Sequence, residues 1–339
     1  SDGGHAEYVT ILSDGESTLS PDIAPPVITD KESFLSAVRD SGLVGLGGAA
    51  FPTHIKLNPP PGKTVDTLIV NAAECEPYIT VDHRICIEGA AHAVEGALAI
   101  AQWCGVSTII FGIEDNKKQA AKALNEAIRL YGKSEHWPKG GISVKVLPTS
   151  YPTGAEKVLI RLLNGRVVPE GGLPADVGVI VQNVTTLHFL GLYLKTGMPL
   201  IRKAITVDGS AVQSPGNFDV PIGASIEEVI EKAGGTVTDP AKVIMGGPLM
   251  GVAVDHIQRP ILKHNNAILV MSEEDAVLPV ESACILCGRC VRACPMRLMP
   301  MALDKAARAN NPEELSDRHV MNCIECGSCS YVCPAKRYL

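Results

Sequence analysis

The chain has few aromatic residues, no excess of basic residues and no long apolar run. Aromatic residues make up 4% of the 339 positions, and the formal net charge is −7 at pH 7. An acidic chain of this kind lacks the basic surface that is typical of nucleic-acid-binding proteins. No run of about 18 apolar residues is present, so the sequence predicts no membrane-spanning helix.

Glycine and proline are plentiful instead, with 32 and 24 residues, and hydrophobic residues reach 46%. This composition predicts a packed globular protein with many tight turns and close backbone approaches. The length is enough for two or three domains, each with its own core.

Eight of the eleven cysteines form a motif that occurs twice. The pattern C-x2-C-x2-C-x3-C-P spans residues 284–295 and again residues 323–334. Disulfide frameworks belong mostly to small secreted domains, whereas these cysteines end a large chain. A structural zinc site is the more serious alternative. Two-cluster ferredoxins use this spacing, and there the fourth cysteine of each run binds the other cluster.

The motifs therefore predict two [4Fe–4S] clusters with crossed ligands. Gly288 and Gly327 suit a close approach of the backbone to the clusters, and residues 301–315 predict a helix followed by a helix start. The first cysteine set is Cys284, Cys287, Cys290 and Cys333, and the second cysteine set is Cys294, Cys323, Cys326 and Cys329.

A glycine-rich loop, GLVGLGGAAFP at residues 42–52, follows a predicted helix over 29–42. A capping box of Thr29 and Glu32 is expected to start that helix, and Gly42 to end it. The glycines after Gly42 permit the backbone to approach a planar ring or a phosphate. A purely structural turn is the alternative for such a loop.

The next 120 residues alternate strand and helix patterns, which predicts an α/β domain. A strand at 67–70 leads into a polar turn that carries Asn71, Glu74 and Glu76, and a single helix is expected over 85–105. In a parallel sheet such a turn faces the crevice at the carboxyl ends of the strands. Residues 143–164 repeat the scheme, with a loop that contains Gly154 before a helix.

Four ordered segments carry a resemblance to a known family. GLVGLGGAAFPTHIKL, VNAAECEPYITVDHR, YPTGAEKVLIRLLNGR and VIVQNVTTL occur in an order similar to that of the FMN- and NADH-binding subunit of respiratory complex I. With the paired cysteine motifs, the chain more closely resembles the C subunit of the Rnf (Rsx) electron transport complex. A cobalamin reductase of similar construction is the near alternative.

The resemblance implies the fold class: an α/β flavin-binding domain of the complex I type, a β-grasp (soluble-ligand-binding) domain, and a helical two-cluster ferredoxin-like domain. The last two are expected at 197–270 and 271–339, after the flavin domain at 28–196. Residues 1–27 are expected to be a linker or the tail of a missing N-terminal domain. The β-grasp part shows no polar constellation, so we expect a structural spacer.

The resemblance also implies the binding residues. Lys56 would offset the phosphate charge of FMN, Phe51 would stack on adenine, and NAD(H) would bind beside the flavin. Without the family, the same polar residues read as turn residues or surface charges, and Phe51 as core. The implied contacts are Gly45, Gly47, Gly48, Lys56, Asn71, Glu74 and Asn183 for FMN, and Gly154, Glu156 and Phe51 for the nucleotide pocket.

The sequence departs from the complex I pattern at several positions of the implied site. Ala73 stands where that pattern has an acidic residue, and Ala155 where it has a second glutamate beside Glu156. Leu46 and Cys75 replace an arginine and a serine. These departures fall mainly on the half of the site that would bind NADH.

As a member of this family, the chain is expected to be the electron-input component of an ion-translocating NADH:ferredoxin oxidoreductase. The other subunits, a ferredoxin-like redox partner and NADH are the implied partners. A peripheral position on the cytoplasmic face of the bacterial inner membrane is implied as well. The competing hypothesis is an electron-transfer adaptor that does not bind NADH.

Overall fold

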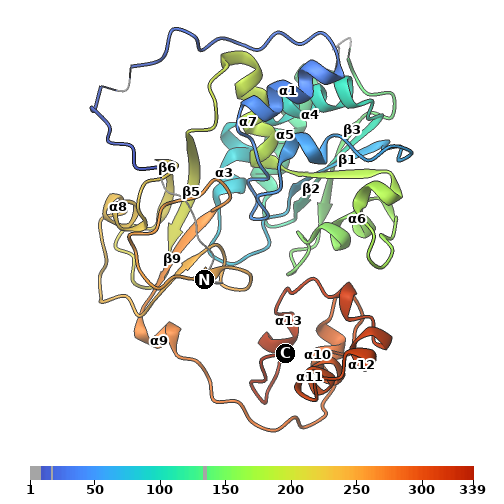
Figure 1. Cartoon of the computed structure of the whole chain (residues 1–339), viewed down its shortest axis with the longest axis vertical. Coiled ribbons are helices and arrows are strands. Elements are labelled where there is room, and N and C mark those ends of the chain that lie inside the picture. Colours follow the sequence, from blue (N-terminus) through green and yellow to red (C-terminus); the bar gives the residue numbers. More distant parts are fainter. Residues whose placement is uncertain (1–8, 17, 133–135) are drawn as a thin grey trace.

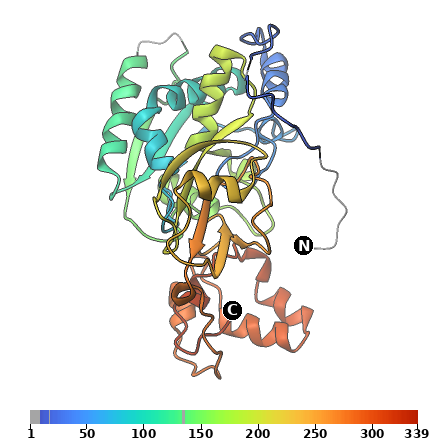
Figure 2. The ribbon, with the colours of Figure 1, turned by 90° about the vertical axis from the view of Figure 1, so that its left-hand side faces the viewer.

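The computed structural model describes residues 9–16, 18–132 and 136–339. Three regions follow one another along the chain: a parallel α/β region, a second mixed sheet and a small helical region (Figure 1). The view turned by 90° again places the helical region at one end of the molecule, below both sheets (Figure 2). Residues 1–8 and 17 of the predicted N-terminal linker lie outside the described residues.

The first sheet contains four parallel strands in the order β3-β2-β1-β4. The chain runs outward from β1 to β3 and then returns past β1 to form β4, so the direction of the strand order reverses between β1 and β4. Ligands of open α/β sheets bind at the carboxyl edge beside such a switch point. The strands are β1 (Thr67–Ala72), β2 (Thr108–Glu114), β3 (Ile142–Leu147) and β4 (Val179–Asn183).

Helices cover both faces of this sheet, and successive side chains of a strand point alternately to one face and to the other. Leu68, Val70 and Phe111 belong to one hydrophobic cluster, and Ile69 and Val181 belong to another. The first cluster packs against α1 (Lys31–Asp40), α4 (Ala90–Cys104), α5 (Lys118–Tyr131) and α7 (Val184–Thr196), and the second against α6 (Glu156–Asn164).

Two helix boundaries differ from the sequence prediction. The helix predicted over 85–105 is divided into α3 (Val81–Glu88) and α4 by Gly89, where a Cβ would collide with the ring of His188. The capping box of α1 is formed by Asp30 and Ser33, one residue later than predicted. Gly42 has φ +73° just beyond the C-cap of α1, as predicted.

The second sheet has the order β6-β5-β9-β7-β8, and α8 (Ile226–Lys232) packs against it. Its β5 and β6 form an antiparallel hairpin, and α8 follows them in the chain. The strands are β5 (Arg202–Asp208), β6 (Gly216–Pro221), β7 (Lys242–Met245), β8 (Val252–Ala253) and β9 (Ala267–Met271).

The C-terminal region consists of short helices around the cysteine motifs. Helices α11 (Pro300–Arg308) and α12 (Pro312–Asp317) confirm the predicted helix and helix start between the motifs. Among the described residues, no helix combines the length and the hydropathy that crossing a membrane requires. The remaining short helices are α2 (Thr53–Lys56), η1 (Pro174–Val177), α9 (Glu273–Ala276), α10 (Arg289–Ala293), η2 (Val320–Asn322) and α13 (Ser328–Tyr331).

Candidate functional site

The switch point of the first sheet is marked by two asparagines. Asn71 at the end of β1 and Asn183 at the end of β4 are direct partners in the parallel register. The amide of Asn71 donates to the carbonyl oxygen of Gly154 at 2.8 Å, which ties the loop before α6 to the sheet. The side-chain oxygen of Asn183 accepts from the first N–H groups of α7 and so caps that helix. The structure therefore brings the predicted residues from three separate motifs together.

The glycine loop lies over Asn183. A Cβ on Gly47 would lie 2.9 Å from Nδ2 and 3.0 Å from Cγ of Asn183, so only glycine fits this approach. The backbone N–H of Leu46 donates to Oγ1 of Thr186 at 3.0 Å, which fixes the loop to α7. Gly48 has φ +117°, and nothing lies where its Cβ would project. The loop thus presents bare, exposed backbone above the carboxyl edge of the sheet.

The two charged residues predicted for different cofactors meet each other. Nζ of Lys56 lies 3.1 Å from Oε1 of Glu156, the first residue of α6. The cation predicted to offset a phosphate is therefore partnered by the carboxylate predicted for the nucleotide pocket. Phe51 is half exposed and is not part of the buried core.

The acidic turn after β1 does not send all of its side chains into one crevice. The carboxylate of Glu74 accepts from the backbone N–H groups of Asp82 at 2.6 Å and His83 at 3.1 Å, at the start of α3. Burial, with the nearby Asp82 carboxylate, raises the pKa of Glu74 well above its usual value. Glu76 instead accepts from the N–H groups of Leu249 and Met250, in the loop between β7 and β8.

Sequence reasoning missed several polar groups that hold this site. Asp82 accepts from Asn183 at 2.6 Å and from the hydroxyl of Thr185, and burial raises its pKa. Lys117 is buried and donates to the carbonyl oxygen of Ala73 at 2.9 Å. Asp82 and Thr185 lie inside two of the segments that carry the family resemblance, so the resemblance could have identified them as site residues.

No local pattern in the sequence marks Lys203 as part of this site, because it lies on β5 of the other sheet. Its ammonium donates to the carbonyl oxygens of Leu46 at 3.4 Å and Lys263 at 3.0 Å. Burial lowers its pKa to about 8. The lysine therefore joins the second sheet to the glycine loop.

These residues fit a flavin phosphate and ring. The exposed glycine backbone offers a surface without side chains, and Ala155 leaves the start of α6 without a side-chain cap. Uncapped N–H groups at a helix N-terminus favour a bound anion. Both features border the same switch point, through Asn183 and Asn71.

The first cysteine set converges on one small cavity. Cys284, Cys287 and Cys290 from the first motif line it together with Cys333 from the second motif. Gly288, Pro334 and Arg337 complete much of the wall. This crossed lining is the arrangement that the spacing predicted for a cluster shared between the motifs.

The two motifs have the same backbone conformation. Gly288 and Gly327 have φ +70° and +71°, and each directly precedes a short helix. In both motifs, the residue two positions before the glycine and the residue nine positions after it also have positive φ. In the first motif these are Leu286 (55°) and Arg297 (58°), and in the second motif Glu325 (53°) and Lys336 (54°). Sulfurs of the second set accept backbone N–H groups, Cys323 from Glu325 at 3.4 Å and Cys294 from Leu298 at 3.3 Å. Such bonds suit thiolate ligands of a cluster.

Burial disfavours the thiolate form of the other three cysteines. Burial raises the pKa of Cys86 well above its usual value, and that of Cys104 to about 11. Cys86 is fully buried in the core, whereas Cys104 is partly exposed. Cys75 accepts from the N–H of Gly154 at 3.3 Å, and burial raises its pKa to about 11. Within the described ranges, no three histidine, cysteine or acidic side chains are placed to hold a single metal ion.

The second cysteine motif touches the α/β region. The hydroxyl of Tyr151 donates to the carbonyl oxygen of Cys326 at 2.7 Å. The carbonyl oxygen of Leu249, next to the N–H groups that bind Glu76, lies 3.6 Å from the Cβ position of Gly327. Tyr151 is three residues before Gly154, so this contact links the second set to the edge of the switch point.

Comparison with known proteins matches three families in this order. The Nuo51 FMN-binding domain matches residues 38–190, the SLBB domain residues 204–253 and the 4Fe-4S dicluster domain residues 277–334. The C subunit of the Na(+)-translocating ferredoxin:NAD(+) oxidoreductase complex of Acetobacterium woodii is 41% identical over 340 residues, which is 99% of this chain and 75% of that protein. The chain belongs to the family of the Rnf C subunit. This confirms the resemblance found in the sequence and the predicted fold class.

Other members of this family are similar over most of the chain. The C subunit of the proton-translocating ferredoxin:NAD(+) oxidoreductase complex of Clostridium ljungdahlii is 43% identical over 85% of this chain. The C subunit of the ion-translocating oxidoreductase complex of Rhodobacter capsulatus is 36% identical over 90%. The chain spans 61% and 58% of the lengths of these two relatives.

A solved structure shares the fold of this member of the Rnf family. The NAD+-reducing [NiFe]-hydrogenase in its air-oxidized state superposes with a TM-score of 0.61 at 24% identity, over 72% of this chain and 47% of that one. The 4Fe-4S dicluster family at residues 277–334 favours iron–sulfur clusters over the zinc alternative.

Proposed function

We propose that this protein is the electron-input component of an ion-translocating NADH:ferredoxin oxidoreductase complex. It would pass electrons between NAD(H), FMN and two [4Fe–4S] clusters. When bound, FMN supplies the conversion between two-electron and one-electron steps, and the clusters supply one-electron carriers. The observation that carries the proposal is the contact of Tyr151 with Cys326, because it connects the flavin-type site to a cluster motif.

The chain's own residues position both ends of that path. Thr186 holds the glycine loop, with its bare backbone, at the carboxyl edge of the sheet, where Gly47 lies directly against Asn183. Asn71 holds the loop of Gly154, and the same loop carries Tyr151. The second set would therefore hold the cluster nearer to the flavin, and the first set the outer one.

The crossed ligand sets are part of this proposal. The cavity lined by Cys284, Cys287, Cys290 and Cys333 supports the first set, and the matching conformations at Gly288 and Gly327 support an equivalent second set. We also propose the division into residues 1–27, 28–196, 197–270 and 271–339, since the three family matches each fall within one of the last three parts.

One observation favours the alternative of an adaptor that does not bind NADH. Glu156 is already paired with Lys56 at 3.1 Å, and Ala155 and Ala73 stand where the complex I pattern has further acidic residues. The NADH half of the site is therefore poorer in free carboxylates than the complex I pattern predicts.

As the electron-input component, the protein would lie peripherally on the cytoplasmic face of the membrane, with the other subunits as partners.

An anaerobic titration of the chain, loaded with FMN, iron and sulfide, separates the two candidates. Bleaching of the flavin absorbance by NADH, followed by electron paramagnetic resonance signals of reduced clusters, is expected. Dithionite serves as the control reductant. Reduction by dithionite but not by NADH would contradict NADH entry and favour the adaptor.

A further inference from the structure

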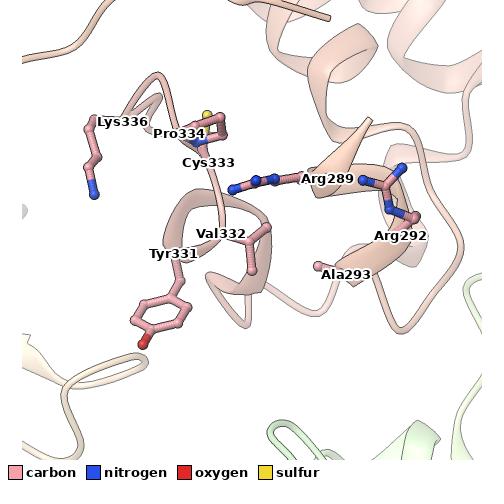
Figure 3. A pocket seen from close by; sticks show the side chains of 8 residues that line it. All are labelled: Arg289, Arg292, Ala293, Tyr331, Val332, Cys333, Pro334 and Lys336. Carbon is pink, nitrogen blue, oxygen red and sulfur yellow. The ribbon is translucent and has the colours of Figure 1, made fainter. Parts of the chain in front are cut away.

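A basic groove opens on the surface of the helical region. It is a cavity of about 720 Å³ whose lining includes Arg289 and Arg292 of α10, Tyr331 of α13, and Cys333 and Lys336 beyond it. Figure 3 shows these side chains around the cavity. We call this site, defined by those five residues, the basic groove. No acidic residue is among the residues that line it.

The three cations of the groove have no carboxylate partner within the described part of the chain. By contrast, the nearby Arg337 and Arg308 both form ion pairs with Asp304. The whole chain carries a net charge of −7, so an unpaired basic cluster stands out against its surroundings. Unpaired surface cations of this kind attract an acidic partner.

The groove borders the first set through Cys333. Ile285 and Leu286, between the first two cysteines of that set, are 66% and 73% exposed. The equivalent Ile324 of the second motif is only partly exposed, and that motif contacts Tyr151 of the α/β region. Cys284 and Cys287 of the first set are exposed, so a partner in the groove can reach this set.

We propose that the basic groove docks an acidic one-electron carrier protein. The inference rests on the proposed function and names the surface through which its path ends. One electron passes between the redox centre of that carrier and the cluster held by the first set, and no bond or proton is exchanged. Tyr331, which is 78% exposed, and the nearby arginines are residue types that protein interfaces favour.

The test is the affinity of the full, cluster-loaded chain for a purified acidic bacterial-type ferredoxin, measured by calorimetry over a series of salt concentrations. The variant is R289E/K336E, which reverses two charges of the groove. The matched control is K118E/K305E, which makes the same change at two exposed lysines outside the groove. We expect binding by the variant to be about tenfold or more weaker at low salt, with a smaller salt dependence, whereas the control stays within about twofold.

Three outcomes would overturn the docking proposal: equal affinities for variant and wild type, an equal loss in the control, or competitive binding of inorganic pyrophosphate in the groove. The last would identify a small-anion site. Iron, sulfide and paramagnetic resonance measurements on each protein come first. Absence of clusters from the wild type would refute the proposed function itself, whereas clusters without selective binding would refute only the docking surface.

Discussion

Replacement of Gly47 by alanine tests whether the glycine loop must lie directly on Asn183. The new Cβ would lie 2.9–3.0 Å from three atoms of the Asn183 side chain. Asn183 has little freedom to move, because it caps α7 and donates to Asp82 at 2.6 Å. Its loss as a cap would cost about 1 kcal/mol, and overpacking of this kind costs about 1–3 kcal/mol.

The loop is therefore expected to lift off the sheet in Gly47→Ala. Movement of the loop would relieve about 2 kcal/mol of strain, and FMN binding would have to return the loop to its original position at that cost. FMN is therefore expected to bind about 30-fold more weakly. Quenching of flavin fluorescence during titration of the apoprotein measures this affinity. Thermal unfolding of the same samples shows whether the fold survives.

The same loop offers a matched control. A Cβ on Gly45 would lie 3.7 Å from the carbonyl oxygen and 3.8 Å from the nitrogen of Phe51, which is ordinary van der Waals contact. Gly45→Ala should therefore retain FMN with an affinity within about threefold of the wild type. The reasoning is refuted if Gly47→Ala binds FMN as the wild type does, or if both variants lose it equally.

Three further predictions concern the cysteine sets and the buried charges. Cys294→Ser should remove the paramagnetic signal of the cluster assigned to the second set and keep that of the first; loss of only the first would show that the ligands are not crossed. Tyr151→Phe should lower the free energy of unfolding in urea by about 1 kcal/mol through loss of the bond to Cys326, whereas Tyr331→Phe, at an exposed position, should not change it. Because the pKa of Lys203 is lowered to about 8, the folded state binds fewer protons than the unfolded state between about pH 8 and pH 10.5. As the pH rises through that window, the free energy of unfolding of the wild type should therefore increase by about 3 kcal/mol relative to that of Lys203→Met. Parallel stability curves of these two proteins would contradict the burial of a titrating lysine.

The positions of the helices and strands could be predicted well where a local signal exists. The strand after residue 66, the hairpin of β5 and β6, and the helices between the cysteine motifs follow from hydrophobic periodicity and turn residues. Boundaries that depend on distant contacts could not. At Gly89, between α3 and α4, the ring of His188 from α7 occupies the space that a Cβ would need, so only glycine fits there.

The candidate site divides in the same way. Asn71 and Asn183 could be singled out because each follows a buried strand, and the sheet register then makes them neighbours. The ion pair of Lys56 with Glu156 and the contact of Lys203 with Leu46 join residues 100 and 157 positions apart. No local pattern in the sequence encodes such pairs.

The sequence by itself determined the chemistry of the electron carriers, because the spacing of the cysteines and the glycine before each short helix set the local backbone conformation. It also determined the order of the three folded regions. Only the tertiary structure decided that it is the second cysteine motif that contacts the α/β region. That choice depends on Tyr151 and on the loop of Leu249, which reach the second motif from two other regions of the chain. Packing between regions, and not local propensity, therefore orients the cysteine motifs relative to the α/β region.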